Sequence, residues 1–235
     1  MARGYLEGGA LAGLAGGLSY GLFLATVGSA FAVGLEALGD GHDHGGAAVS
    51  DATTAAVSVG SGVLWGLLLG ITVFGIAYYF LEPALPGSGV TKRLALAGSG
   101  FLIASGAPWL VLPPQAPGVE RALPTETRMA WYGGMMAASA VVVVLAGLAH
   151  RETAGRHVAV RTLATLAPLA LLAVPVLLAP ANPTHGHVPA ALATAYRWTV
   201  VFGQAGLWAT VAGVHAWLGD PEIVTAERSY RSTAD

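Results

Sequence analysis

Six long apolar stretches separated by short polar loops constrain the fold of this chain more than any other feature. A helix of about 20 apolar residues crosses the roughly 30 Å hydrocarbon core of a bilayer. The stretches that reach this length lie near Gly8–Leu38, Ala55–Phe80, Leu94–Leu112, Met129–Ala149, Thr162–Ala181 and Trp198–Leu218. We therefore expect an all-α, polytopic membrane bundle of about six transmembrane helices in residues 1–219. Residues 220–235 are expected to form a cytoplasmic tail.

The composition is that of a membrane protein. Of the 235 residues, 54% are hydrophobic and 10% are charged, whereas about a quarter of the residues of a soluble domain are charged. The mean hydropathy is +0.64. Because so little polar surface is available to face water, we expect a multi-pass protein of the plasma or inner membrane, in contact with lipid.

Several functions lack the residues that they need. The chain has no basic run that would bind nucleic acid. It has no phosphate-binding glycine loop with lysine, no H-E-x-x-H motif and no G-x-S-x-G motif, so we expect no enzyme activity and no permanent cofactor. Cysteine is absent, which leaves nitrogen and oxygen atoms as the ligands for any metal ion.

The basic residues predict which loops face the cytoplasm. With six spans, eight of the 11 basic residues fall on one side: Arg3, Lys92, Arg93, Arg151, Arg156, Arg161, Arg228 and Arg231. The other three, Arg121, Arg128 and Arg197, fall on the opposite side. Since cytoplasmic loops carry an excess of Lys and Arg, both termini are predicted to be cytoplasmic.

The first span has an alternative interpretation as a signal peptide, because Ala30-Phe31-Ala32 resembles a small-residue cleavage site. Removal of this segment would leave five spans. Against this, the apolar run exceeds the roughly 7–15 residues of a signal peptide. Glycine also recurs every fourth residue in it, at Gly9, Gly13, Gly17 and Gly21, and again in the second span at Gly62, Gly66 and Gly70. Such stripes let neighbouring helix backbones approach closely, so we expect the first helix to be retained and both stripes to serve helix packing.

Two His-x-His motifs are the main candidates for metal binding. The loop after the first span contains Asp40, His42, Asp43 and His44, and the loop before the sixth contains His185 and His187. Both loops are predicted to lie outside the membrane, on the same face. Imidazole nitrogen suits Co, Ni, Zn and Cu, and residues i and i+2 of an extended segment point the same way. We therefore predict a divalent-metal site formed by the four histidines with help from the two aspartates. The alternative is that these histidines are only solvated loop residues.

Three polar residues could line a pathway for the ion. Glu36 lies near the outer end of the first span, Gln204 within the sixth, and His215 near its inner end, where it could form an exit site with Glu7 and Glu82. Each also has a structural interpretation: Glu36 as an interface marker, Gln204 as an interhelical hydrogen-bonding group and His215 as an interfacial side chain.

The segment from Pro108-Trp109 through Pro113-Pro114 and Pro117, followed by Arg128 and Trp131-Tyr132, is rich in proline and aromatic residues. Proline stiffens a loop, and Trp and Tyr favour the membrane interface. We expect this segment to form a rigid cap that leads into the fourth span.

These features together resemble the CbtA family of predicted cobalt transporter subunits. The resemblance covers roughly Gly4 to Leu218 and rests on the glycine-rich first helix with Gly41-His42-Asp43-His44, the proline segment, and Ala179-Pro180 followed by His185-Gly186-His187-Val188-Pro189. It implies uptake of Co²⁺ for cobalamin synthesis, with Ni²⁺ or Zn²⁺ as other candidate ions. It also implies a small single-span partner, CbtB, that bears a histidine motif.

Two other function classes stay open on the sequence alone. One is a structural or assembly subunit that packs through its glycine stripes and transports nothing. The other is a membrane metal sensor or metalloenzyme, in which the bound ion stays in place. The chain could also form a homo-oligomer.

Overall fold

The structure is a computed structural model, and it describes residues 2–31, 51–116, 119–185 and 188–219. The chain separates into two compact units, which are described in turn. Unit 1 comprises Met1–Ala30, Gly45–Gly98 and Phe202–Asp235, and unit 2 comprises Phe31–His44 and Ser99–Val201. The predicted boundary at residue 219 between membrane domain and tail stays a prediction, because residues 220–235 lie outside the described part.

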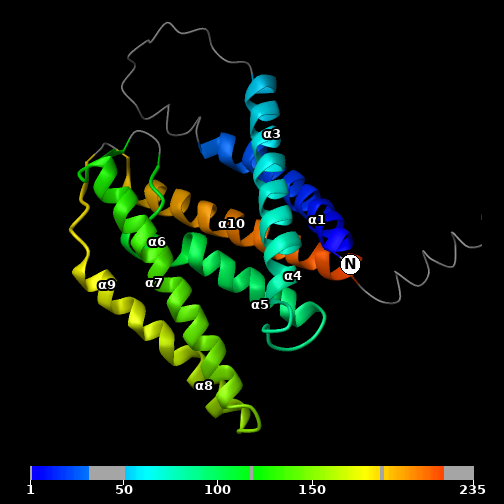
Figure 1. Cartoon of the computed structure of the whole chain (residues 1–235). Helices are drawn as coiled ribbons and strands as arrows, with labels where there is room; N and C mark the ends of the chain where they lie inside the picture. Colours follow the sequence, from blue (N-terminus) through cyan, green and yellow to red (C-terminus); the bar gives the residue numbers. More distant parts are fainter. Residues whose placement is uncertain (1, 32–50, 117–118, 186–187, 220–235) are drawn as a thin grey trace, which may run out of the picture. The chain divides into compact units, whose positions relative to one another are not determined.

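Unit 1 is built from four helical segments (Figure 1). The first is α1 (Ala2–Phe23), which continues as the π-helix η1 (Leu24–Gly28). The second is α3 (Asp51–Leu69), which continues as the π-helix η2 (Gly70–Ala77) and the short α4 (Tyr78–Leu81). The others are the beginning of α5 (Val90–Phe101) and the second half of α10 (Ala190–Leu218).

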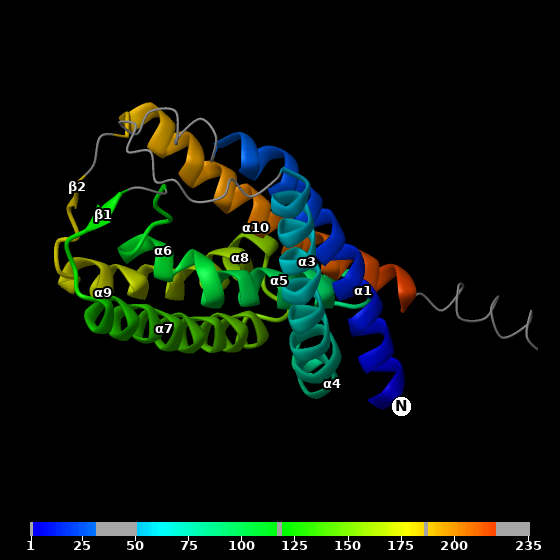
Figure 2. The same cartoon turned by 90° about the horizontal axis from the view of Figure 1, so that it is seen from above.

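The two glycine stripes face each other between α1 and the α3–η2 helix, which lie side by side in Figure 2. A Cβ atom placed on Gly13 would lie 2.3 Å from the carbonyl oxygen of Gly66, and one placed on Gly9 would lie 2.4 Å from that of Gly70. Cβ atoms in proteins essentially never come within 3.0 Å of another heavy atom. Only residues without a side chain allow these two backbones to approach so closely. The predicted packing role of the stripes is therefore confirmed.

Unit 2 contains the remaining helices and a short ribbon. The third span continues from α5 through the π-helix η3 (Leu102–Gly106) into α6 (Pro108–Val111). The long α7 (Thr125–Glu152) packs beside α8 (Val158–Leu166), the 3₁₀-helix η4 (Ala167–Leu172) and α9 (Ala173–Leu178), as both views show (Figures 1 and 2). Two-residue strands, β1 (Glu120–Arg121) and β2 (Thr184–His185), pair antiparallel.

The core of unit 2 gathers buried side chains of three of its helical segments. It contains Ala107, Met135, Val142 and Leu172. Met135 is a packing residue here, as an isolated methionine pair in the sequence suggests. The fifth span changes from α- to 3₁₀-geometry at Ala167, directly before Pro168. Proline has no backbone N–H to donate, so the α-helical hydrogen-bond pattern cannot continue through this position.

Five helices are long and apolar enough to cross a membrane among the described residues: Ala2–Phe31, Ala52–Leu81, Val90–Val111, Thr125–Glu152 and Val158–Leu178. Each overlaps one of the first five predicted spans and begins three to six residues before it, and residues 32–38 of the first prediction lie outside the described part. The sixth prediction falls on α10, a helix of 29 residues that is not among the five. Gln204 and His215 lower the mean hydropathy of its sequence. Whether α10 crosses the membrane stays a prediction.

Contacts within unit 1 join segment ends that the six-span arrangement puts on one side. The Tyr5 hydroxyl, near the start of α1, donates to the Glu82 carboxylate, just after α4. Arg93, near the start of α5, donates to His215, near the end of α10. The start of α1, the end of α10 and the loop between the second and third spans are therefore found at one end of this unit.

Contacts within unit 2 also join segment ends that the six-span arrangement puts on the same side of the membrane. The β1–β2 ribbon joins the loop before α7 to the loop before α10, and the Arg197 Nε donates to the Pro114 carbonyl oxygen at 3.4 Å. At the other end of α7, the Arg161 guanidinium lies 2.5 Å from the His150 ring nitrogen. These pairings agree with alternating spans, α10 included. The assignment of one side to the cytoplasm still rests on the basic residues.

Candidate functional site

Most of the predicted metal ligands lie outside the described residues. This applies to Asp40, His42, Asp43, His44 and His187, and also to Glu36 at the predicted mouth of the pathway. The proposed convergence of the two His-x-His motifs is therefore untested. Within the described ranges there is no group of three or more His, Asp or Glu residues able to hold a metal ion.

His185 is the one predicted ligand whose backbone is described. It belongs to β2 and is the Cα partner of Glu120 in β1, while Thr184 is the partner of Arg121 (Figure 2). The backbone is extended at this position, which is the geometry that directs residues i and i+2 to the same face. The loop that carries the second His-x-His motif is thus held by backbone pairing to the loop after the third span.

Gln204 takes part in a hydrogen bond between helices. Its Nε2 atom donates to the hydroxyl oxygen of Tyr20 at 3.2 Å, which joins α10 to α1. This bond agrees with the interpretation of Gln204 as an interhelical hydrogen-bonding group, which was the alternative to a residue that lines the ion pathway. The face of α10 between Gln204 and His215 is closed by packing, because Val211 and Ala212 are fully buried there.

His215 lies in a closely packed environment in unit 1. It is only 4% exposed, and its ring lies near the rings of Phe74 and Tyr78, with centroid separations of 5.7 and 5.2 Å. The Arg93 Nε donates to its Nδ1 at 3.0 Å, and the same guanidinium lies 5.1 Å from the Tyr78 ring centroid. The imidazole is therefore buried within the protein. The interpretation of His215 as an interfacial side chain is wrong.

The hydrogen bond from Arg93 fixes the chemistry of His215. A guanidinium can only donate, so Nδ1 accepts with its lone pair, and a neutral ring then carries its proton on Nε2. In this tautomer neither nitrogen has a lone pair free to bind a metal ion. His215 could serve as a ligand only after Arg93 had moved away.

The carboxylates considered with His215 have other partners. Glu82 accepts from the hydroxyls of Tyr5 and Tyr78, the latter at 3.4 Å, and lies 3.9 Å from the Lys92 ammonium. Glu7 pairs with Arg3 at 2.7 Å on the exposed surface of α1. The structure therefore does not gather Glu7, Glu82 and His215 into an exit site.

The sequence analysis missed the network that surrounds His215 and Glu82. Arg93 entered the sequence argument only as a positive charge at a loop, and Tyr5 and Tyr78 did not enter it at all. The spacing of Tyr78 and Glu82, four residues apart at the end of a span, was the available local signal. The partners Tyr5 and Arg93 come from other helices, so no sequence spacing could indicate them.

Comparison with known families gives a match over nearly the whole chain. A family model described as "Probable cobalt transporter subunit (CbtA)" matches residues 2–220. The chain belongs to the CbtA family. No curated protein and no solved structure matches the chain.

Membership of the CbtA family fixes the broad class of this protein. It is a multi-pass protein of the cell membrane and a probable cobalt transporter subunit. The word subunit in the family description implies at least one further component of the transport system.

Proposed function

We propose that this CbtA chain captures a divalent transition metal ion at its outer face, with Co²⁺ as the main cargo, and admits it to the cytoplasm. His42, His44, His185 and His187 are the capture ligands, and Asp40 and Asp43 assist them. The observation that carries this proposal is the antiparallel pairing of His185 with Glu120, which gives the first histidine of the second motif an extended backbone on an anchored loop. Support for transport and for cobalt comes from the family match.

The chemistry of the two loops suits transient capture. Neutral imidazole offers a nitrogen lone pair that suits Co²⁺, Ni²⁺ and Zn²⁺, and carboxylates add negative charge that attracts a cation. Glycine on both sides of the first motif, at Gly41 and Gly45, allows the loop to close around an ion.

Inward movement of the ion needs energy, which comes either from the membrane potential or from a partner protein. The membrane potential supplies about 2.3 kcal/mol per charge per 100 mV, and a divalent cation gains twice that amount. Glu36 is placed at the mouth of the pathway in this proposal. Gln204 joins the pathway only if α10 separates from α1, because its present partner is Tyr20. His215 joins it only if Arg93 of α5 moves away. The further component is a small single-span protein with a histidine motif, like CbtB.

An uptake assay in vesicles tests the proposal. The full chain is reconstituted with and without the small partner, and uptake of radioactive Co²⁺ is followed at limiting concentration. Replacing His42 and His44 together, or His185 and His187 together, with Ala should lower uptake at least about tenfold, because each replacement removes two of the four imidazole ligands. His157→Ala is the matched control, since this histidine caps α8 in a loop predicted to be cytoplasmic.

The same assay separates the other function classes. A structural subunit would show neither binding nor uptake, with or without its partner. A sensor or metalloenzyme would retain bound ion without moving it into the vesicle. Unchanged uptake in both double variants would refute the role of the histidines while leaving transport itself intact.

A further inference from the structure

The two-stranded ribbon of unit 2 pairs an acidic residue with one of the proposed capture histidines. Glu120 of β1 and His185 of β2 are Cα partners, and Arg121 is the partner of Thr184. Directly opposed residues of an antiparallel pair lie on the same face, with Cβ atoms about 4.5–5.5 Å apart. The register therefore puts positions 120 and 185 on one face of the ribbon. The sequence analysis did not include Glu120 among the metal ligands.

The register also separates this position from the nearest arginine. Successive residues of a strand belong to opposite faces, so Arg121 shares the other face with Thr184. A slip of one residue would instead place Arg121 opposite His185. An arginine at that position would repel a metal ion bound by the imidazole. The observed pairing thus unites a carboxylate and an imidazole on one face of the ribbon.

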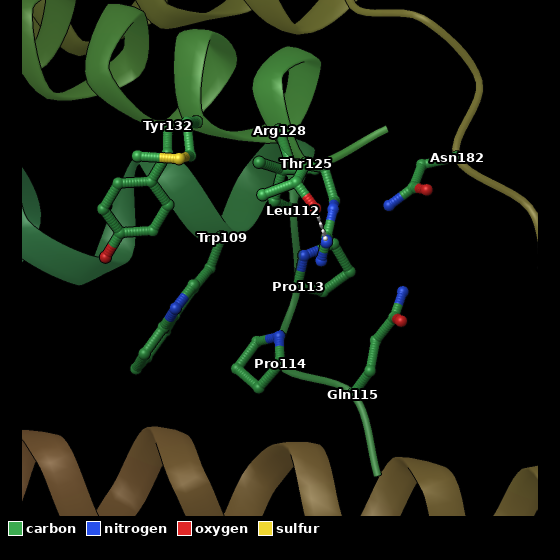
Figure 3. A pocket seen from close by; sticks show the side chains of 10 residues that line it. Trp109, Leu112, Pro113, Pro114, Gln115, Thr125, Arg128, Tyr132 and Asn182 are labelled. Atoms are coloured by element: carbon green, nitrogen blue, oxygen red, sulfur yellow. Dashed lines mark hydrogen bonds between the residues drawn. The ribbon is translucent and has the colours of Figure 1, made fainter. Parts of the chain in front are cut away.

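The segments that lead into the two strands are anchored. The turn before β1 is closed by a backbone bond from the Val119 N–H to the Ala116 carbonyl oxygen at 3.4 Å, and Ala116 is only 5% exposed. The proline segment before this turn and Asn182, two residues before β2, line one cavity of about 350 Å³, in which Pro114, Gln115 and Asn182 are labelled (Figure 3). Anchored segments lose less conformational freedom when they bind a ligand, which favours binding at this position.

A carboxylate and an imidazole at opposed positions suit a divalent transition metal ion. Both groups bind such ions with bonds of about 2.0–2.2 Å, a length that the spacing of opposed residues allows. The carboxylate also offsets one of the two positive charges of the ion. The described ranges contain no group of three or more His, Asp or Glu residues. This pair therefore forms one side of a site, and water or further ligands occupy the other coordination positions of the ion.

We propose that Glu120 is a ligand of the captured metal ion, which it binds jointly with His185 across the β1–β2 ribbon. This inference rests on the proposed capture function, to which it adds a carboxylate ligand. The bound ion links the two strands, and with them the loop after the third span and the loop before α10. Capture of the ion therefore stabilises the pairing of these two loops.

Titration of the full chain in detergent with Co²⁺ alone tests this ligand. Calorimetry gives the Kd, and the visible absorption of Co²⁺ reports its ligands. Glu120→Gln should raise the Kd at least about tenfold and change the absorption, because an oxygen ligand is lost. Glu120→His should restore the Kd to within about threefold, since imidazole also binds Co²⁺. Glu126→Gln, which removes an exposed carboxylate from the first turn of α7, is the matched control and should change neither.

A double-mutant cycle tests whether the two residues bind the same ion. In a His185→Ala background, Glu120→Gln should change the Kd by less than about twofold, because a single carboxylate no longer chelates the ion. An undiminished loss in that background would place Glu120 in a separate site and overturn the proposal. Gel filtration of each variant establishes that it is folded, and Glu120→His tests the ligand even if Glu120→Gln does not fold.

Two further results would overturn the proposal. One is an unchanged Kd for Glu120→Gln, which would leave the opposed residues as a surface ion pair. The other is an equal loss with Glu126→Gln, which would indicate general attraction by negative charge. If His185→Ala lowers the affinity and Glu120→Gln does not, the capture function stands without Glu120. If the variants of both His-x-His motifs also bind Co²⁺ unchanged, the capture function itself fails.

Discussion

Arg93 and His215 are 122 residues apart in the sequence, and the Nε of Arg93 donates to Nδ1 of His215 at 3.0 Å. Unit 2 contains a second pair of the same kind, in which the Arg161 guanidinium lies 2.5 Å from Nε2 of His150. Both pairs lie at helix ends that the basic residues predict to be cytoplasmic. In each, arginine donates to the imidazole and keeps the accepting nitrogen from binding a metal ion.

Loss of the Arg93 guanidinium should destabilise unit 1. Arg93→Met removes the hydrogen bond to His215, the bond from Nη1 to the Gly89 carbonyl oxygen at 3.0 Å and the contact with the Tyr78 ring. We expect a loss of about 1–3 kcal/mol, since a buried acceptor is left unpaired. Thermal unfolding of the detergent-solubilised chain measures this, with exposed Arg156→Met as the control. Equal melting temperatures for the two variants would show that the pair contributes nothing.

Close packing of the two glycine stripes should tolerate no side chain. In Gly13→Ala the new methyl group would lie 2.3 Å from the Gly66 carbonyl oxygen, so α1 and α3 must separate. We expect destabilisation by about 1–3 kcal/mol from overpacking, with loss of folded material on gel filtration. Gly147→Ala on α7 is the control, because a Cβ there meets no atom within 4 Å and alanine favours the helix. A Gly13→Ala variant as stable as the control would contradict the observed helix contact.

The Gln204–Tyr20 bond should contribute to packing between α1 and α10. A double-mutant cycle with Gln204→Leu and Tyr20→Phe is expected to give a coupling of about 0.6 kcal/mol, the average for hydrogen bonds between membrane helices. Thermal unfolding gives the coupling, and Co²⁺ uptake is measured on the same variants. If Gln204 serves packing alone, uptake by folded Gln204→Leu stays within about twofold of the original. A larger loss of uptake without loss of stability would assign Gln204 to the pathway.

The absence of cysteine allows a direct measurement of membrane orientation. A single cysteine at His185 should react with a membrane-impermeant maleimide in intact cells, because its loop is predicted to be outside. A single cysteine at Arg156 should react only after the membrane is permeabilised. The opposite pattern would reverse the predicted orientation. Reaction of both in intact cells would show that the two loops lie on the same side, which an odd number of spans between them contradicts.

Much of the secondary structure follows from local sequence, because each apolar span must satisfy its backbone hydrogen bonds internally once it is in lipid. Five spans and the packing role of Gly13 and Gly66 were predictable for this reason. The sixth span was less predictable, since Gln204 and His215 lower the mean hydropathy of α10 without preventing a helix. The capture loops stay predictions, because their histidines lie outside the described residues.

By itself, the sequence determined that this chain enters the membrane as a series of helices. It also determined that two of these helices have a stripe of glycine residues on one face. A periodic pattern within one segment contains that information. Only the tertiary structure decided that Arg93 occupies Nδ1 of His215 and that Glu82 is bound by tyrosines. Those relationships join segments far apart in the chain, and the side chains meet only after the helices have packed.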